Sequence, residues 1–323
     1  MNGRVVRLAA AFGAAVLLLG GCTDDGGTPT PLPTESGSGG TELAWRRIAD
    51  APTERQEVAA AVVGGKIYVV GGLVSNGATA AVEIYDPASD SWTAGPPLPL
   101  ALHHAMAAEQ GGRLFVMGGF ALSRGGAAVR DVFILEDGRW RDGPPLRRAR
   151  GAGAAANVGG RIVVVGGIAG DRHVGPVEIL DEGAWHDGAS IPNLRDHLGA
   201  ATQGSLLYAV GGRRGGDHFG TFDVYDLATD RWSQLPDMPT ARSGNGAAFL
   251  ADRVVSVGGE GPRIFPEVEA YEPDARRWTR LPDLAVPVHG VGVVAVGTDV
   301  YALVGGDKVG GAPTRVCQVL KIG

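Results

Sequence analysis

Short apolar runs alternate along residues 43–323 with clusters of glycine, aspartate and proline. The first group of runs covers residues 58–63, 66–72, 81–86 and 91–95 and is rich in Val, Ile, Tyr and Trp, which favour strands. We find no segment with the 3.6-residue periodicity of an amphipathic helix over a useful length. The pattern predicts an all-β domain built from short antiparallel strands.

Two markers repeat along the chain with the same period. A Gly-Gly doublet closes an apolar run six times, with successive steps of 47, 48, 45, 47 and 47 residues. Tryptophan also occurs six times, with steps of 47, 48, 45, 47 and 46 residues. Four short strands within each such unit correspond to one blade of a β-propeller. The sequence therefore predicts six blades of four antiparallel strands.

The two ends of the domain are predicted to share the last blade. Trp45 precedes the first doublet, whereas no tryptophan follows the sixth doublet at residues 305–306. We expect residues 43–48 to supply the fourth strand of the last blade. A sheet completed in this way leaves no open edge that could pair with another chain.

The combined pattern resembles the kelch family. It consists of an apolar run, the Gly-Gly doublet, a strand that ends in Tyr-Asp, and then Trp. The Tyr-acid pairs are Tyr85-Asp86, Tyr225-Asp226 and Tyr271-Glu272, whereas the other three blades have Leu135, Leu180 and Leu320 in place of Tyr. The resemblance covers residues 43–323 and implies a kelch propeller, a fold that carries both binding modules and enzymes.

The N-terminal segment has the pattern of an export signal followed by a spacer. Arg4 and Arg7 precede an apolar stretch over residues 8–19, and Leu19-Gly20-Gly21-Cys22 resembles the bacterial lipobox. We expect a signal peptide at 1–21, a lipid on Cys22 and a polar tether over 22–42. The alternative is an ordinary signal peptide with an incidental cysteine. The expected location is the outer face of the bacterial cytoplasmic membrane, with the lipid as the only membrane attachment.

Composition excludes several classes of function. The formal net charge is −6, without the basic surface that nucleic-acid binding requires. The two cysteines, Cys22 and Cys317, provide neither a zinc spacing nor a disulfide framework, and Cys317 aligns with core positions. We find no nucleophile elbow, phosphate-binding loop or metalloprotease motif. We therefore expect a monomer without a cofactor.

Candidate binding residues are predicted at the mouth of the central channel. The residue that opens the first strand of each blade alternates between Arg and His, in the order Arg55, His103, Arg150, His197, Arg242 and His289. The loops after the doublets add Arg213 and Lys308 to the same mouth. Such a cationic pocket suits a carboxylate or another anion. A structural role is the alternative for the arginines, and histidines on every second blade are expected to lie too far apart to bind a metal.

Acidic residues recur at one position of the third strand, namely Glu83, Glu178, Asp223 and Glu269, which indicates a structural role in pairing across blades.

Two functions then remain open. The preferred one is a surface-anchored, non-enzymatic module that binds a protein, a peptide, a cell-wall component or a small anionic carbohydrate. The resemblance also implies an alternative, a carbohydrate-active enzyme similar to the kelch-type sialic acid mutarotase, with Glu260 or His289 as its acid/base group.

Overall fold

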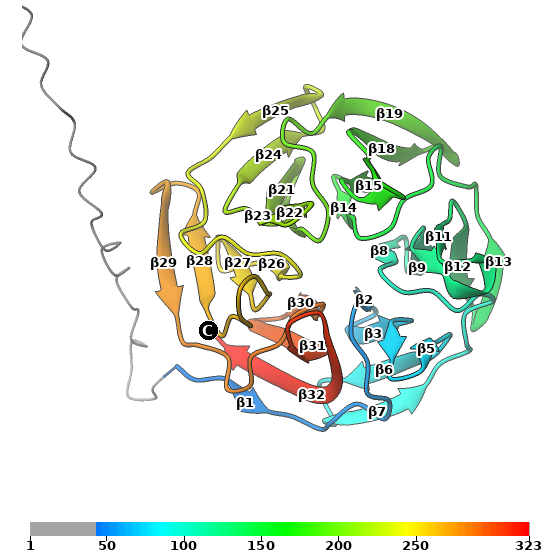
Figure 1. Cartoon of the computed structure of the whole chain (residues 1–323), viewed down its shortest axis with the longest axis horizontal. Coiled ribbons are helices and arrows are strands. Elements are labelled where there is room, and N and C mark those ends of the chain that lie inside the picture. The colour runs from blue at the N-terminus through cyan, green and yellow to red at the C-terminus, as the bar shows by residue number, and fades with distance from the viewer. Residues whose placement is uncertain (1–42, 323) are drawn as a thin grey trace, which may run out of the picture. The chain divides into compact units, whose positions relative to one another are not determined.

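The computed structural model describes residues 43–322 and shows six four-stranded antiparallel sheets arranged as blades around one axis (Figure 1). The all-β fold and the six blades predicted from the sequence are confirmed. In the described part of the chain, the one helical element is the short 3-10 turn η1 (Leu122–Arg124). No helix between residues 43 and 322 has the length and apolar character needed to cross a bilayer.

The two inner strands of each blade lie nearest the central axis (Figure 1). The innermost strands are β2 (Ala59–Val63), β8 (Met106–Gln110), β14 (Ala154–Val158), β20 (Gly199–Gln203), β26 (Gly246–Leu250) and β30 (Gly292–Val296). The second strands are β3 (Lys66–Val70), β9 (Arg113–Met117), β15 (Arg161–Val165), β21 (Leu206–Val210), β27 (Arg253–Val257) and β31 (Asp299–Lys308). Tight turns such as Gly64-Gly65, where φ is positive at both residues, join the two strands.

The two outer strands complete each blade. The third strands are β6 (Val82–Asp86), β12 (Val132–Glu136), β18 (Pro176–Asp181), β24 (Phe222–Asp226), β28 (Val268–Glu272) and β32 (Gly311–Lys321). The outermost strands are β7 (Ser91–Ala94), β13 (Arg139–Asp142), β19 (Ala184–Ser190), β25 (Arg231–Gln234), β29 (Arg277–Leu281) and β1 (Arg46–Arg47). The strand bounds predicted for the first blade agree with the structure to within two residues.

The last blade is closed by the N-terminal strand, as predicted. Strand β1 pairs antiparallel with β32, with Arg46 opposite Val319 and Arg47 opposite Gln318. The Ile48 N–H then donates to the carbonyl oxygen of Cys317 at 3.1 Å. Segments about 270 residues apart in the sequence therefore form one sheet, and β32 has a paired edge at the junction.

The Gly-Gly doublets are required by close backbone approach. Gly71 and Gly72 have φ values of 62° and 109°, in the region that favours glycine. A Cβ atom at Gly71 would lie 2.4 Å from the carbonyl oxygen of Leu102 in the next blade. After each of the first four doublets the chain forms a small hairpin on the same face: β4–β5 (Leu73–Val74, Gly77–Ala78), β10–β11 (Phe120–Ala121, Ala127–Ala128), β16–β17 (Ile168–Ala169, Arg172–His173) and β22–β23 (Arg213–Arg214, Asp217–His218). We call the segments after all six doublets the rim.

The repeated tryptophans join neighbouring blades. Each indole N–H donates to a backbone carbonyl of the preceding blade, at 2.8–3.1 Å. The pairs are Trp45–Pro282, Trp92–Ala49, Trp140–Pro96, Trp185–Pro144, Trp232–Ala189 and Trp278–Pro236. The period of the tryptophans thus follows from a hydrogen bond that every blade makes once.

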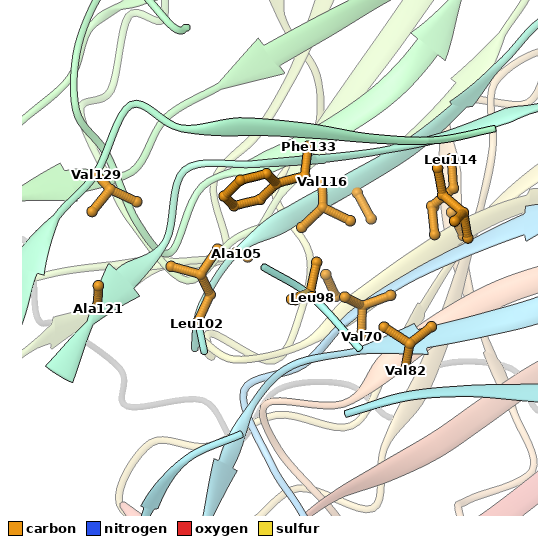
Figure 2. Packing of buried hydrophobic residues seen from close by; sticks show 14 residues of the cluster. Val70, Val82, Leu98, Leu102, Ala105, Leu114, Val116, Ala121, Val129 and Phe133 are labelled. Carbon is orange, nitrogen blue, oxygen red and sulfur yellow. The ribbon is translucent and has the colours of Figure 1, made fainter. Parts of the chain in front are cut away.

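Apolar side chains fill the space between blades. Between the first two blades, Val70 and Val82 pack with Val116 and Phe133 (Figure 2). Leu102, from the segment that enters the second blade, lies in the same cluster and is completely buried. Burial of one such side chain stabilises a fold by about 1.5–3 kcal/mol. These interfaces hold the inner strands rigidly around the axis, where the candidate site lies.

Candidate functional site at the channel mouth

Four buried ion pairs anchor the segments that lead into the inner strands. Each guanidinium is 0% exposed and contacts a carboxylate of the third strand in its own blade, at 2.7–2.8 Å. The pairs are Arg55–Glu83, Arg150–Glu178, Arg195–Asp223 and Arg242–Glu269. The structural role predicted for the recurring acids is confirmed, but the pairing lies within blades and not across them.

The structure corrects the ligand-binding role predicted for Arg55, Arg150 and Arg242. Their guanidinium groups are fully buried and bonded to groups of their own blades, so they present no charge at the mouth. The predicted alternation of Arg and His is also wrong. Arg195, and not His197, occupies the arginine position of the fourth blade, and the histidines lie one or two residues further along the chain.

A closed ring of backbone hydrogen bonds surrounds the axis two residues after the arginine position. Each N–H donates to the carbonyl oxygen of the equivalent residue in the preceding blade, at 2.7–2.9 Å. The members are Glu57, His104, Ala152, His197, Gly244 and Gly290, and their φ values are 52–62°. The preceding residues pair with the rim, which places this axial ring at the mouth end of the channel.

Three side chains of the axial ring converge. The potential ligand atoms of Glu57, His104 and His197 lie within 4.8 Å of one another. His104 Nε2 is 3.2 Å from Glu57 Oε2, and the His104 and His197 ring centroids are 4.8 Å apart. A Cβ atom at Gly290 would lie 2.6 Å from the Glu57 carboxyl group, so glycine is required there. The ring and the inner strands line a channel cavity of about 140 Å³.

Asp196 and Arg213 organise one side of the mouth. Asp196 accepts hydrogen bonds from His197 Nδ1 and from His173 Nε2, the latter at 2.6 Å. Arg213 donates to His197 Nε2 at 3.0 Å and to Glu260 Oε1 at 3.1 Å. The Arg213 side chain is 31% exposed, which makes it a cationic group that a ligand at the mouth can reach.

The two residues of the predicted alternative acid/base pair, Glu260 and His289, are brought together. His289 Nδ1 lies 3.6 Å from Glu260 Oε2 and 3.4 Å from Glu57 Oε1, and the residue is 1% exposed. Burial lowers the pKa of His289, but the hydrogen bond with Glu57 and the charges of both carboxylates outweigh burial and raise that pKa overall. The two carboxylates therefore favour the protonated form of His289 more than water does.

Glu57 and His104, which are neighbours in the axial ring, have their pKa values changed by burial and by nearby charges. Burial raises the pKa of Glu57, but His104 and His289 more than offset this, so the pKa lies well below its ordinary value. Burial lowers the pKa of His104 to about 3. At neutral pH, Glu57 is therefore a carboxylate and His104 a neutral imidazole.

The remaining predicted residues lie on or near the rim. His103 is half-buried, and its Nδ1 atom shares a 2.6 Å hydrogen bond with His104 Nδ1. Lys308 is exposed where β31 turns into β32. In residues 43–322 the exposed large hydrophobic side chains are Leu122, at 48%, and Val309, at 55%, and both belong to rim segments. The mouth thus combines apolar contacts with Arg213 and the histidine–carboxylate cluster.

The sequence did not point to Glu57 or Asp196, and it left open whether His103 or the adjacent His104 faces inward. The available signal was the arginine position: His197 follows Arg195 by two residues, as Glu57 follows Arg55. If the blades are aligned on this arginine, Glu57 and His197 fall at a position that glycine occupies in other blades. Choosing the first polar residue of each blade instead mixed three successive positions.

Comparisons with known proteins agree with the repeat pattern. The kelch motif description matches residues 54–99 and 194–239, which cover the first and fourth blades. Kelch-like protein 35 of Homo sapiens is 40% identical over 75 residues, and beta-scruin of Limulus polyphemus is 40% identical over 76 residues. Each alignment covers 23% of this chain, and the two cover only 13% and 8% of the relatives' own lengths.

A solved structure is similar over most of the domain. The structure described as "Structure of YjhT" aligns with a TM-score of 0.75 and 15% sequence identity, covering 84% of this chain and 96% of that chain. At this identity the similarity concerns the fold alone. The chain therefore carries two matches to the kelch motif on a six-bladed β-propeller, and it is similar over short segments to kelch-repeat proteins.

Proposed function

We propose that the chain is a surface-anchored, non-enzymatic kelch propeller that binds a protein or peptide segment carrying a carboxylate at its channel mouth. The observation that carries this proposal is the composition of the rim, where the exposed Leu122 and Val309 share a face with the accessible Arg213. These three residues belong to the second, sixth and fourth blades, and arginine is enriched at the hot spots of protein-binding surfaces. The kelch propeller fold fits this role.

Selection of peptides on the full chain tests the site. Peptides are selected from a displayed library, and their affinities are then measured for wild type, Leu122→Ser/Val309→Ser and Arg213→Gln. We expect each rim variant to bind at least roughly tenfold more weakly, since loss of a binding hot spot costs more than 1 kcal/mol. Asp252→Asn, in the exposed turn between β26 and β27, is the control on the opposite face. Peptides that bind all variants equally would exclude the rim as the site.

Anchoring rests on the sequence, because residues 1–42 lie outside the described part of the chain. The support is the lipobox-like Leu19-Gly20-Gly21-Cys22 and the polar segment that follows it. Labelling bacteria that express the chain with an alkyne fatty acid should mark the wild type and Cys317→Ala. Cys22→Ala should stay unlabelled, and label on that variant would contradict lipidation at Cys22.

One arrangement favours a second candidate function, a carbohydrate-active enzyme. Arg213 could hold a sugar carboxylate, while Glu260 and His289 supply an acid and a base within 3.6 Å of each other. NMR exchange between the anomers of a sialic acid distinguishes the two functions. Acceleration by wild type that Glu260→Gln abolishes would support the enzyme, whereas rates equal to buffer would exclude this activity.

A further inference from the structure

Glu57, His104 and His197 form a donor set typical of transition-metal sites. They belong to the first, second and fourth blades and meet on the axis because all three occupy the axial ring. Donors of a tetrahedral Zn²⁺ site, with bonds of about 2.0–2.1 Å, lie about 3.3 Å apart. Here the potential donor atoms are already within 4.8 Å, so side-chain shifts of roughly 1 Å complete the coordination.

The ring backbone does not require side chains at these three positions. Their φ values of 52–54° lie in the left-handed region, which costs a non-glycine residue roughly 1–2 kcal/mol. Gly244 and Gly290 occupy equivalent positions in the same ring, so the backbone accepts glycine without loss of the ring hydrogen bonds. Side chains kept at strained positions cluster at ligand-binding sites.

The environment of His197 leaves the lone pair of this imidazole on Nε2. Its Nδ1–H donates to Asp196, whose other carboxylate oxygen accepts a hydrogen bond from His173 at 2.6 Å. A carboxylate behind an imidazole fixes the tautomer and the ring orientation of metal-binding histidines. Because the guanidinium of Arg213 can only donate, its 3.0 Å contact requires a lone pair on Nε2.

The other two donors are oriented in the same way. His104 contacts His103 through Nδ1 and turns Nε2 toward Glu57 Oε2 at 3.2 Å. The second oxygen of Glu57, Oε1, faces His289 at 3.4 Å. In Glu57 and His104, one atom is thus held by a neighbour while Oε2 and Nε2 face each other, whereas in His197 the Nε2 lone pair is contacted by Arg213.

We propose that Glu57, His104 and His197 bind one divalent transition-metal ion on the axis of the propeller, for which Zn²⁺ is the test ion. Two imidazoles and one carboxylate suit Zn²⁺ and its neighbours, whereas Ca²⁺ and Mg²⁺ take oxygen ligands. Three protein ligands leave a fourth coordination position for water or a bound group. This inference goes beyond the proposed peptide binding and does not depend on it.

Arg213 competes with the metal ion for His197. Its guanidinium occupies the Nε2 lone pair and adds a positive charge beside the centre. The guanidinium also contacts Glu260 at 3.1 Å and Asp196 at 3.5 Å, so these carboxylates can retain it when a metal displaces it from His197. Removing this side chain is therefore expected to strengthen metal binding.

Zinc titration of the full chain tests the site. The protein carries Cys22→Ala and no histidine tag, is stripped with a chelator, and is titrated with Zn²⁺ against a fluorescent indicator. We expect one Zn²⁺ per chain with micromolar or tighter affinity, and visible absorption of the Co²⁺ form at the intensity typical of four-coordinate sites. Absence of a one-to-one complex at micromolar protein would overturn the proposal, whatever the peptide-binding result.

Glycine variants separate ligation from folding. His104→Gly and His197→Gly keep the ring backbone and should weaken Zn²⁺ binding by at least roughly 100-fold. His186→Ala, on the outer strand β19, is the control and should bind as wild type. Arg213→Met should bind more tightly. Unchanged affinity in either glycine variant, an equal loss in the control, or weaker binding by Arg213→Met would contradict the assignment, and melting curves establish that each variant is folded.

Discussion

Replacing Arg150 by Met should reveal how strongly the buried ion pairs hold the blades. In the third blade, the Arg150 guanidinium donates to Glu178 Oε1 at 2.7 Å, to the Gly166 carbonyl at 3.0 Å and to the Pro176 carbonyl at 3.2 Å. Both charged groups are 0% exposed. Methionine matches the length of the aliphatic stem, so the change mainly removes the buried counter-charge of the carboxylate and leaves it with the half-exposed Arg148 at 3.8 Å.

The magnitude follows from that uncompensated charge. Breaking a buried ion pair on one side costs about 3–5 kcal/mol. Unfolding entropy is about 2.1 cal/mol/K per residue, which gives about 0.6 kcal/mol/K for roughly 280 residues. A loss of about 4 kcal/mol therefore lowers the Tm by about 7 °C. Calorimetry and urea unfolding of the full chain measure the two quantities.

Two further variants make the test specific. Glu178→Gln in the Arg150→Met background removes the buried charge but keeps an acceptor for only one of the two backbone N–H groups, of Arg147 and Arg148, that bond to separate Glu178 oxygens, so it should recover part of the loss. Arg148→Met is the matched control, because that side chain is 38% exposed and its pair with Asp187 is worth less than about 1 kcal/mol, while its contact with Glu178 is longer, at 3.8 Å. Equal losses in Arg150→Met and Arg148→Met would refute the reasoning.

Three other changes test the closure, the blade contacts and the core. Deleting residues 43–50 removes β1, so the Tm should fall sharply. The exposed edge of the last blade should also promote self-association, measured by gel filtration. A deletion of equal length further upstream should change neither the Tm nor the self-association. Trp185→Phe loses the 2.8 Å hydrogen bond to Pro144 and should lower the free energy of unfolding in urea by about 0.5–1.5 kcal/mol. An unchanged free energy of unfolding would contradict a stabilising role for this contact. Burial raises the pKa of Cys317 to about 11. In the Cys22→Ala variant, the Cys317 thiol should therefore resist a thiol reagent at pH 8 until the chain unfolds. Rapid labelling of the native protein would contradict the burial of Cys317.

The sequence by itself determined the repeated architecture. Gly-Gly recurs because each of the first five blades makes the same close approach after its second strand, as at Gly71, whereas Val304 and Gly305 take these positions in the last blade. Trp recurs because every blade makes the same indole bond to its neighbour, as at Trp92. Such contacts are imposed once per blade, so they leave a period in the sequence. The position of Trp45 ahead of the first doublet likewise predicted that the N-terminal strand closes the ring.

Only the tertiary structure decided which side chains reach the axis. A difference of one or two residues separates the fully buried Arg195 from Asp196 and from His197 in the axial ring. This register is set by the left-handed backbone conformation and by hydrogen bonds between blades, which a periodic pattern does not encode. The meeting of Glu57, His104 and His197 therefore depends on the closed ring of blades, because residues distant in sequence share one axis only once the ring has formed.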